Sequence, residues 1–272
     1  MPRPRLSISQ VSTRAWTFDE DVSRYAAAGV EGIGVWRGKL HRFGLAEAKE
    51  ILKETGLSVA NLIAEIPLAG EGSGMTGPEF EQGLAVLDIA RELGTDLVIV
   101  IPGNSLGRST EMMRTLTVRA LGALAPHAAG RGVRLALEAI RAPFRDYLHT
   151  LEDTLSIVHE VDHPAVGAVV DTWHVWDEPG LLDSIRKEID RILVVQFSDF
   201  RRPTLSRDER LLPGDGVSNL MEILTAVHRA GYRGWYDLEV FSADLWQGDN
   251  SVIVERTVEW FERFRLAAAD PN

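Results

Sequence analysis

Four side chains that can bind a metal ion each stand at the end of a short apolar segment. Three are the carboxylates Glu138, Asp171 and Glu239, and the fourth is the amide Gln196. Each apolar segment is typical of a buried parallel strand, and the segments are separated by stretches of helical length. Because parallel strands end at the same edge of a sheet, we expect the four side chains to converge.

Three converging carboxylates would repel one another unless a cation or a proton lay between them. The chain contains no cysteine, so any metal site must use oxygen and imidazole ligands. Carboxylate and amide oxygens are preferred by hard divalent ions. The four side chains therefore predict a divalent-metal cofactor, with Mn²⁺ as the first choice and Mg²⁺ or Co²⁺ as alternatives.

Further side chains near the strand ends suit substrate binding. His174 follows Asp171 by three residues, a position that favours a hydrogen-bond donor or acid catalyst over an ordinary structural histidine. Arg201 and Arg202 follow Gln196, and either is a solvated loop residue or holds a substrate oxygen. Several tryptophans at or after strand ends are expected to line a pocket for a sugar ring: Trp36, Trp173, Trp176 and Trp246.

A regular alternation of predicted strands and helices must position these side chains. Apolar runs predict strands at residues 6–9, 32–36, 58–64, 96–101, 133–138, 166–171, 192–196 and 235–239. Amphipathic periods, caps and glycine stops predict helices at residues 17–28, 45–55, 78–93, 110–129, 150–160, 181–189, 218–230 and 250–266. This alternation implies an α/β fold with a parallel sheet and right-handed crossovers.

Eight such units in about 250 residues are the size of a closed (β/α)8 TIM barrel, which we predict as a single domain over residues 1–272. An open doubly wound sheet is the alternative. It would require a glycine-rich turn after the first strand, and residues 9–17 contain no glycine. Thr17 and Glu20 have the spacing of a capping box, and residues 66–77, with four glycines and a proline, are expected to form a loop.

The composition excludes several kinds of partner. A net charge of -11 opposes binding to nucleic acid or to an anionic membrane surface. The N-terminus lacks the apolar core of a signal peptide, and no segment is apolar for long enough to span a membrane, so we expect a cytoplasmic protein. The expected partner is a small-molecule sugar or keto-sugar substrate, and the formation of a homo-oligomer is left open.

These segments together resemble the xylose isomerase-like barrel superfamily, in particular the sugar phosphate isomerase/epimerase branch that includes ketose 3-epimerases and inosose dehydratases. The resemblance runs through nearly the whole chain, and its most specific parts are residues 137–138, 170–174, 213–216 and 238–242. It implies that Glu138, Asp171 and Glu239 bind a divalent metal and that both glutamates exchange protons with the substrate. It also implies that His174 and Arg202 contact substrate oxygens.

Gln196 departs from the family's usual fourth ligand, which is a histidine. Some dehydratases of the superfamily, such as bacterial 3-dehydroshikimate dehydratases, resemble this chain in having glutamine there, which shifts the expectation toward elimination chemistry. The apurinic endonucleases of the same superfamily resemble a different site, built from many histidines around three zinc ions. This chain has no histidine at the ends of its third, fourth and seventh predicted strands.

The expected activity is that of a metal-dependent isomerase or epimerase acting on a ketose or keto-cyclitol through a metal-stabilised enediolate. The alternative is a metal-dependent lyase or dehydratase that performs β-elimination on a 3-keto sugar, keto-glycoside or dehydroshikimate-like substrate. Both reactions begin by removing a proton beside a carbonyl, so the residues do not choose between them. A third alternative, a non-catalytic sugar-binding barrel, is disfavoured because it has no need of three converging carboxylates.

Overall fold

Short apolar segments form a closed barrel of eight parallel strands in the computed structural model, which describes residues 2–64, 66, 68 and 77–269. The strands pair in sequence order, and β1 closes the barrel against β8. They are β1 (Arg5–Ser9), β2 (Gly32–Trp36), β3 (Ser58–Ala64), β4 (Leu97–Val100), β5 (Arg134–Leu137), β6 (Val166–Asp171), β7 (Ile192–Phe197) and β8 (Trp235–Leu238). The predicted (β/α)8 TIM barrel is therefore confirmed.

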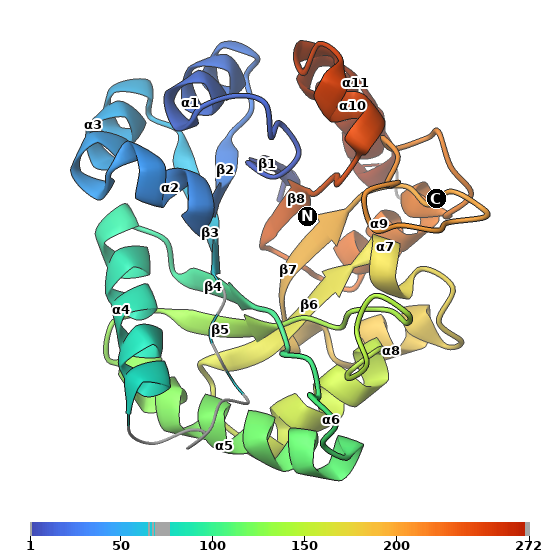
Figure 1. Cartoon of the computed structure of the whole chain (residues 1–272). Coiled ribbons are helices and arrows are strands. Elements are labelled where there is room, and N and C mark those ends of the chain that lie inside the picture. Colours follow the sequence, from blue (N-terminus) through green and yellow to red (C-terminus); the bar gives the residue numbers. More distant parts are fainter. Residues whose placement is uncertain (1, 65, 67, 69–76, 270–272) are drawn as a thin grey trace.

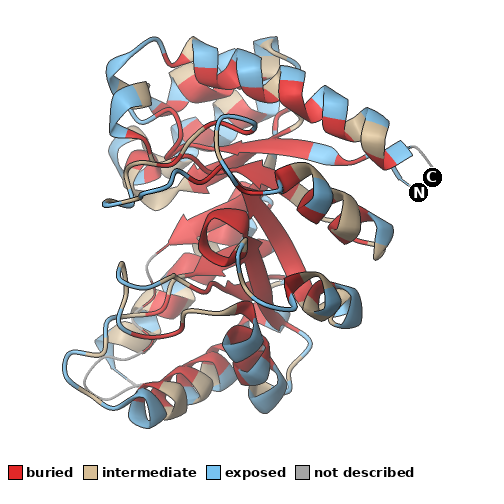
Figure 2. Ribbon diagram, turned by 90° about the vertical axis from the view of Figure 1, so that its right-hand side faces the viewer, coloured by how far each residue is buried: buried red, intermediate tan, exposed pale blue. Residues whose placement is uncertain are grey.

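Helices surround the strands (Figure 1) and are buried on the side that faces the barrel (Figure 2). The longer ones are α1 (Phe18–Ala27), α3 (Leu45–Thr55), α4 (Pro78–Leu93), α5 (Thr110–Ala129), α6 (Leu151–Val161), α8 (Leu181–Lys187), α9 (Leu220–Arg229) and α11 (Ser251–Ala269). Shorter helices lie in the connections: α2 (Arg37–Phe43), α7 (Thr172–Val175), α10 (Ala243–Gln247) and the 3-10 turn η1 (Ile189–Arg191).

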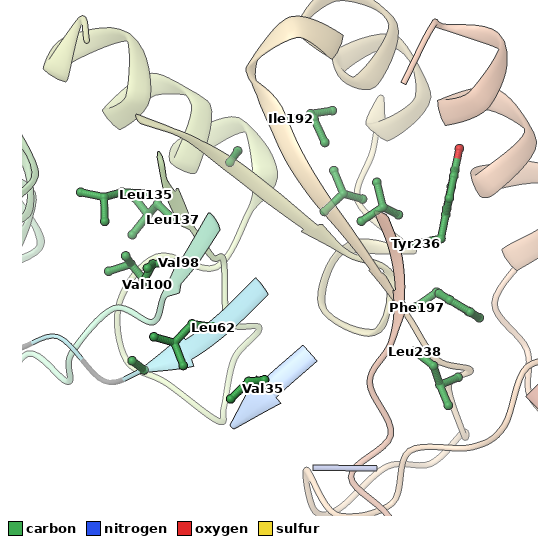
Figure 3. Close-up of a cluster of buried hydrophobic side chains, with 14 of the residues drawn as sticks. Val35, Leu62, Val98, Val100, Leu135, Leu137, Ile192, Phe197, Tyr236 and Leu238 are labelled. Atoms are coloured by element: carbon green, nitrogen blue, oxygen red, sulfur yellow. The ribbon is translucent and has the colours of Figure 1, made fainter. Parts of the chain in front are cut away.

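The strands bury both faces, because successive side chains point alternately toward the helices and into the barrel. Val98 and Val100 of β4 and Leu137 of β5 belong to the outer core, which packs against the helices (Figure 3). Ile99 and Ala136, which alternate with them, belong to a smaller apolar cluster that fills the barrel interior. The same alternation sends one side chain at each strand end toward the mouth of the barrel.

Part of the barrel interior is polar. Asp237 on β8 is fully buried, and it accepts hydrogen bonds from Ser7 Oγ at 2.6 Å and from Asn61 Nδ2 at 3.1 Å. Gly34 on β2 permits this arrangement, since a Cβ atom there would lie 2.8 Å from the Asp237 carboxylate. The carboxyl group of Asp237 is therefore buried inside the barrel, below the strand ends and between β1 and β3.

Several local details differ from the sequence prediction. The α2 helix was not expected, because Gly38 lowers helix propensity and Trp36 before it is no capping residue. The strands β5 and β8 end one residue earlier than predicted, so that Glu138 and Glu239 follow their strands directly. The capping box at Thr17 is confirmed. Most of the predicted loop at residues 66–77 lies outside the described residues.

Candidate active site

The strand register brings the four predicted ligands to one end of the barrel. Asp171 on β6 pairs with Gln196 on β7, and Gln196 in turn pairs with Asp237 on β8. Glu239 follows β8, and its backbone N–H donates to Phe197 O at 3.1 Å. Side chains alternate between the two faces of a strand. Each of these side chains points into the barrel because the residue two positions earlier in its strand does so.

Glu138, Asp171 and His174 form a buried group whose potential ligand atoms all lie within 4.8 Å of one another. His174 Nε2 lies 3.5 Å from Asp171 Oδ2 and 3.8 Å from Glu138 Oε1. On the other side of the ring, the backbone N–H of Arg141 donates to His174 Nδ1 at 3.1 Å. Burial lowers the pKa of His174 to about 3, so the ring is neutral.

Arg210 provides the positive charge at the centre of this group. Its Nη1 donates to Asp171 Oδ2 at 2.8 Å and lies 3.1 Å from Glu239 Oε2, and its Nη2 lies 3.2 Å from His174 Nε2. The guanidinium is almost completely buried and packs over the Trp173 ring at 4.7 Å. A cation thus already stands between the carboxylates that would otherwise repel one another.

Burial and mutual repulsion divide the carboxyl groups by pKa. Burial, then the charges of Glu239 and Asp171, raises the pKa of Glu138 well above its usual range. Burial also raises the pKa of Glu239 to about 8, although Arg210 opposes the shift. Burial acts on Asp171 in the same direction, but the charge and hydrogen bond of Arg210, together with His174 and the Trp173 backbone N–H, outweigh it and lower the pKa. The site therefore holds two carboxyls that keep protons easily and one that stays ionised.

Gln196 is the remaining predicted ligand and is fully buried. Its amide is near enough to lower the pKa values of Asp237 and Glu239. Even so, neither its oxygen nor its nitrogen makes a hydrogen bond of normal geometry with any described residue. A buried amide without a partner is costly, and a bound cation would satisfy its oxygen. The oxygen of this unpaired amide is a donor of the kind that hard divalent ions prefer, and the neighbouring group of Glu138, Asp171 and His174 could hold such an ion.

A cavity of about 590 Å³ opens above these groups, and Glu138, His174, Arg210 and Glu239 line it. Its size is suited to one small organic molecule. Trp36, predicted to contact substrate, lies in the cavity wall together with the apolar side chains of Ile63, Ile101, Ile140, Phe144 and Phe241. The reactive groups are therefore reached through a partly apolar opening.

Four of the side chains predicted to line the pocket or contact substrate are absent from the cavity lining: Trp173, Trp176, Trp246 and Arg202. Trp173 is fully buried behind His174, whose ring meets it edge-on with centroids 4.9 Å apart, and it does not line the cavity. Arg202 is exposed, lies 3.4 Å from Asp177, stacks over Trp176 at 4.7 Å and is also absent from the cavity lining. In place of Arg202, the structure brings Arg210 to the mouth of the barrel.

The sequence analysis missed Arg210 and Asp237. Arg210 lies in the long connection after β7, which turns back over the barrel through a bridge between Asp199 and Leu211. No periodic pattern predicts such a path. Asp237 did leave a signal, because it precedes Glu239 by two residues and the alternation of a strand places both side chains on the same face.

Comparison with known proteins agrees with this architecture. The sequence model of the xylose isomerase-like TIM barrel family matches residues 22–264, and the protein belongs to this family. The 3-dehydroshikimate dehydratase of Pseudomonas putida is 28% identical over 249 residues, which cover 87% of this chain and 38% of that protein. The inosose dehydratase of Geobacillus thermodenitrificans is 26% identical over 251 residues, covering 82% of each chain.

Among solved structures, the crystal structure of a Sinorhizobium meliloti protein matches with a TM-score of 0.85 at 28% identity, covering 95% of this chain and 97% of that one. Inosose isomerases and ketose 3-epimerases are also similar in sequence. The names of these relatives are those of dehydratases, isomerases and epimerases. The chain spans only 38% of the length of the Pseudomonas dehydratases.

Within the described residues, no helix has the length and apolar character needed to cross a membrane.

Proposed function

We propose that the protein is a divalent-metal-dependent isomerase or epimerase of a ketose or keto-cyclitol. The observation that supports this most directly is that Glu138 and Glu239 reach one cavity from two non-adjacent strands, each with a raised pKa. A carboxyl that titrates near the working pH can both remove a proton beside a carbonyl and return one. Return to the opposite face of the same carbon gives an epimer, and return to the neighbouring carbon gives an isomer.

The donor set supports a divalent ion. Glu138, Asp171 and Glu239 would offer carboxylate oxygens, and Gln196 would offer the amide oxygen that has no partner among the described residues. Four oxygen donors favour Mn²⁺, with Mg²⁺ and Co²⁺ as alternatives. When bound, the ion would supply positive charge that stabilises the negative charge developing on the substrate oxygens.

The surrounding side chains have separate roles in this proposal. His174 lines the cavity with a neutral ring and would form a hydrogen bond with a substrate oxygen. Arg210, rather than Arg202, would hold a substrate oxygen, because it alone of the two lines the cavity. Trp36 would pack on the apolar side of the substrate ring. Trp173 would act indirectly, by keeping the His174 ring in place.

A second candidate function is a carbon-oxygen lyase, or dehydratase, acting on a 3-keto sugar, keto-glycoside or dehydroshikimate-like substrate. Two proteins named 3-dehydroshikimate dehydratase, at 28% and 29% identity over 87% of this chain, favour it. The reaction would use the same first proton removal. It would differ only in that a hydroxyl or glycosidic oxygen leaves from the carbon next to the one that lost its proton.

Incubation of the Mn²⁺-loaded protein with keto-sugars and keto-cyclitols in D₂O distinguishes these functions. Deuterium incorporation with a new epimer or isomer supports the first proposal, and loss of water or an aglycone, with or without incorporation, supports the second. If no substrate of either class exchanges deuterium or loses water or an aglycone, both proposals are wrong.

The proton-transfer roles are tested by Glu138→Gln and Glu239→Gln. We expect each variant to lose deuterium exchange by about 10²-fold or more, because an amide cannot accept the proton. Metal binding, measured by calorimetry, should persist at reduced affinity since the amide oxygen remains a donor. A variant that retains near-normal exchange would exclude that glutamate as a base.

A further inference from the structure

The cavity wall carries an excess of arginine side chains, most of which the chemistry above does not use. Among the residues that the structure describes, six arginines line it, against two carboxylates, Glu138 and Glu239. The arginines are Arg14, Arg37, Arg42, Arg145, Arg207 and Arg210. The chain as a whole has a net charge of -11, so this concentration of positive charge opposes the overall balance. It is a local property of the cavity.

Among the described residues, four of these arginines, Arg14, Arg37, Arg42 and Arg145, have no carboxylate partner, whereas several arginines elsewhere in the protein do. Arg131 and Arg256, for example, each pair with an aspartate at 2.8 Å or less. Among the described residues, Arg37 has no ion pair or other polar partner. Arg14 packs only over the Trp246 ring at 5.0 Å, and Arg42 only over the Trp36 ring at 5.6 Å.

The other two arginines, Arg145 and Arg207, also have few polar partners. Within the described part of the chain, the one polar interaction of the Arg145 side chain is a long hydrogen bond to Asn104 Oδ1 at 3.4 Å. Among the same residues, the Arg207 guanidinium interacts with its chain neighbour Asp208, at 3.6 Å, and with the Phe241 ring. Arg210 is different, because its guanidinium group already forms ion pairs with Asp171 and Glu239. Five guanidinium groups of the cavity thus have spare hydrogen-bond donors.

Three of the five come from the β1–β2 side of the mouth. Arg14 lies in the connection after β1, and Arg37 and Arg42 lie on α2, directly after β2. His41, four residues after Arg37 and so on the same face of α2, also lines the cavity. In a closed barrel of eight strands, β1 and β2 lie across from β5 and β6, which carry Glu138 and Asp171. A molecule that spans the cavity would therefore have one end at the proton-transfer groups and the other at these arginines.

Unpaired guanidinium groups that share a cavity repel one another, and an oxyanion between them removes this cost. Guanidinium binds carboxylate and phosphate through paired, charge-assisted hydrogen bonds, whereas a neutral polyol needs no positive charge. We propose that the substrate is a small hydroxylated ketone bearing an oxyanionic group, a carboxylate or a phosphate ester, which Arg14, Arg37 and Arg42 bind. This inference rests on the proposed function for the ketone and extends it to the charge of the substrate.

Matched pairs of ligands test the proposal by calorimetry on the full chain, with and without Mn²⁺. Shikimate is compared with its uncharged methyl ester, and fructose 6-phosphate with fructose. We expect the charged member of at least one pair to bind roughly tenfold or more tightly, with a preference that weakens as salt is added. The pair that responds identifies the anion as carboxylate or phosphate. Equal affinity within both pairs, or no binding of either charged probe at about 10 mM, would overturn the proposal.

Variants locate the effect. Arg37→Gln and Arg14→Gln should each reduce the preference for the charged ligand severalfold while leaving the affinity of the neutral partner unchanged. Arg119→Gln is the matched control, because Arg119 is an exposed residue of α5 outside the cavity and its replacement removes the same charge. If Arg119→Gln weakens anion binding as much as Arg37→Gln does, the effect is one of overall charge and the proposed site is wrong.

The binding measurement and the deuterium-exchange measurement test the anionic substrate and the proposed activity independently of each other. Anion preference that depends on Arg37, without any deuterium exchange, would retain the anionic site and reject the proposed activity. Deuterium exchange into neutral keto-sugars, with no preference for charged ligands, would retain the activity and reject the anionic substrate.

Discussion

Gln196 is the residue whose role can be isolated most cleanly, because its amide is buried without a hydrogen-bond partner among the described residues. We expect Gln196→Leu to weaken Mn²⁺ binding by about tenfold or more, since it removes a neutral donor without changing the charge. Gln196→His should keep a donor and shift the preference toward softer ions such as Zn²⁺. Calorimetric titration of the three proteins measures both effects. Equal Mn²⁺ affinity of Gln196→Leu and the parent would show that Gln196 is not a ligand.

Arg210 and Arg202 form a natural pair for comparison at the same scale. Arg210→Gln should cost about 3–5 kcal/mol in the free energy of unfolding, because it leaves the buried carboxylates of Asp171 and Glu239 without their counter-charge. Arg202→Gln should cost at most about 1 kcal/mol, because its contact with Asp177 is exposed. Urea denaturation in the absence of metal measures both. Similar losses in the two variants would contradict the central position of Arg210.

The connecting elements at the β1–β2 side are held by a second buried ion pair. Lys39 on α2 donates to Asp21 on α1 at 2.6 Å, and Thr13 Oγ1 donates to the same carboxylate at 2.6 Å. Burial raises the pKa of Asp21 to about 7, although Lys39 opposes the shift. This pair fixes α2, the helix that carries Arg37, against α1 and the connection after β1.

We therefore expect Lys39→Met to destabilise the protein by about 3–5 kcal/mol, because it leaves Asp21 buried without its partner. Adding Asp21→Asn should recover part of the loss, since no charge then remains buried. Urea denaturation of the single and double variants tests this. A double variant less stable than Lys39→Met would mean that Asp21 is stabilised by groups other than Lys39.

The sequence predicts some elements of the barrel better than others. The strands and main helices could be predicted because burial on one or both faces leaves a periodic pattern, and the convergence of the polar side chains at the strand ends could be predicted because each closes an apolar run. Such patterns are absent from α2, which has seven residues and an internal glycine, and from the connection after β7. Arg210 and the arginines of α2 were missed for this reason, since their positions depend on how connections fold over the barrel mouth.

At the scale of the whole molecule, the raised carboxyl pKa values link metal binding to pH. Glu239 has a pKa of about 8 without metal, so a proton must leave when the ion binds at any lower pH. Mn²⁺ affinity should rise at least about tenfold per pH unit from pH 6 to 8, because Glu138, whose pKa is also raised, can release a further proton. The pH dependence of the calorimetric affinity tests this, and an affinity that is constant from pH 6 to 8 would contradict it.

The same shift has the opposite sign for folding. A carboxyl with a folded pKa of about 8 and an ordinary value of 4.5 binds more protons in the folded chain over that range. The metal-free protein should therefore lose stability as the pH rises through this window. Mn²⁺ should accordingly raise the unfolding temperature more at pH 8 than at pH 6, and the reverse order would argue against a buried, proton-holding Glu239.

The position of Arg210 has a consequence for how the protein responds to a shortage of trace metal. Its guanidinium bridges Asp171 and Glu239 without the help of any ion, so the charges that a metal would neutralise are already balanced in part. Loss of metal should consequently abolish the proposed activity without unfolding the protein. The folded protein would remain able to bind metal again when the supply returns.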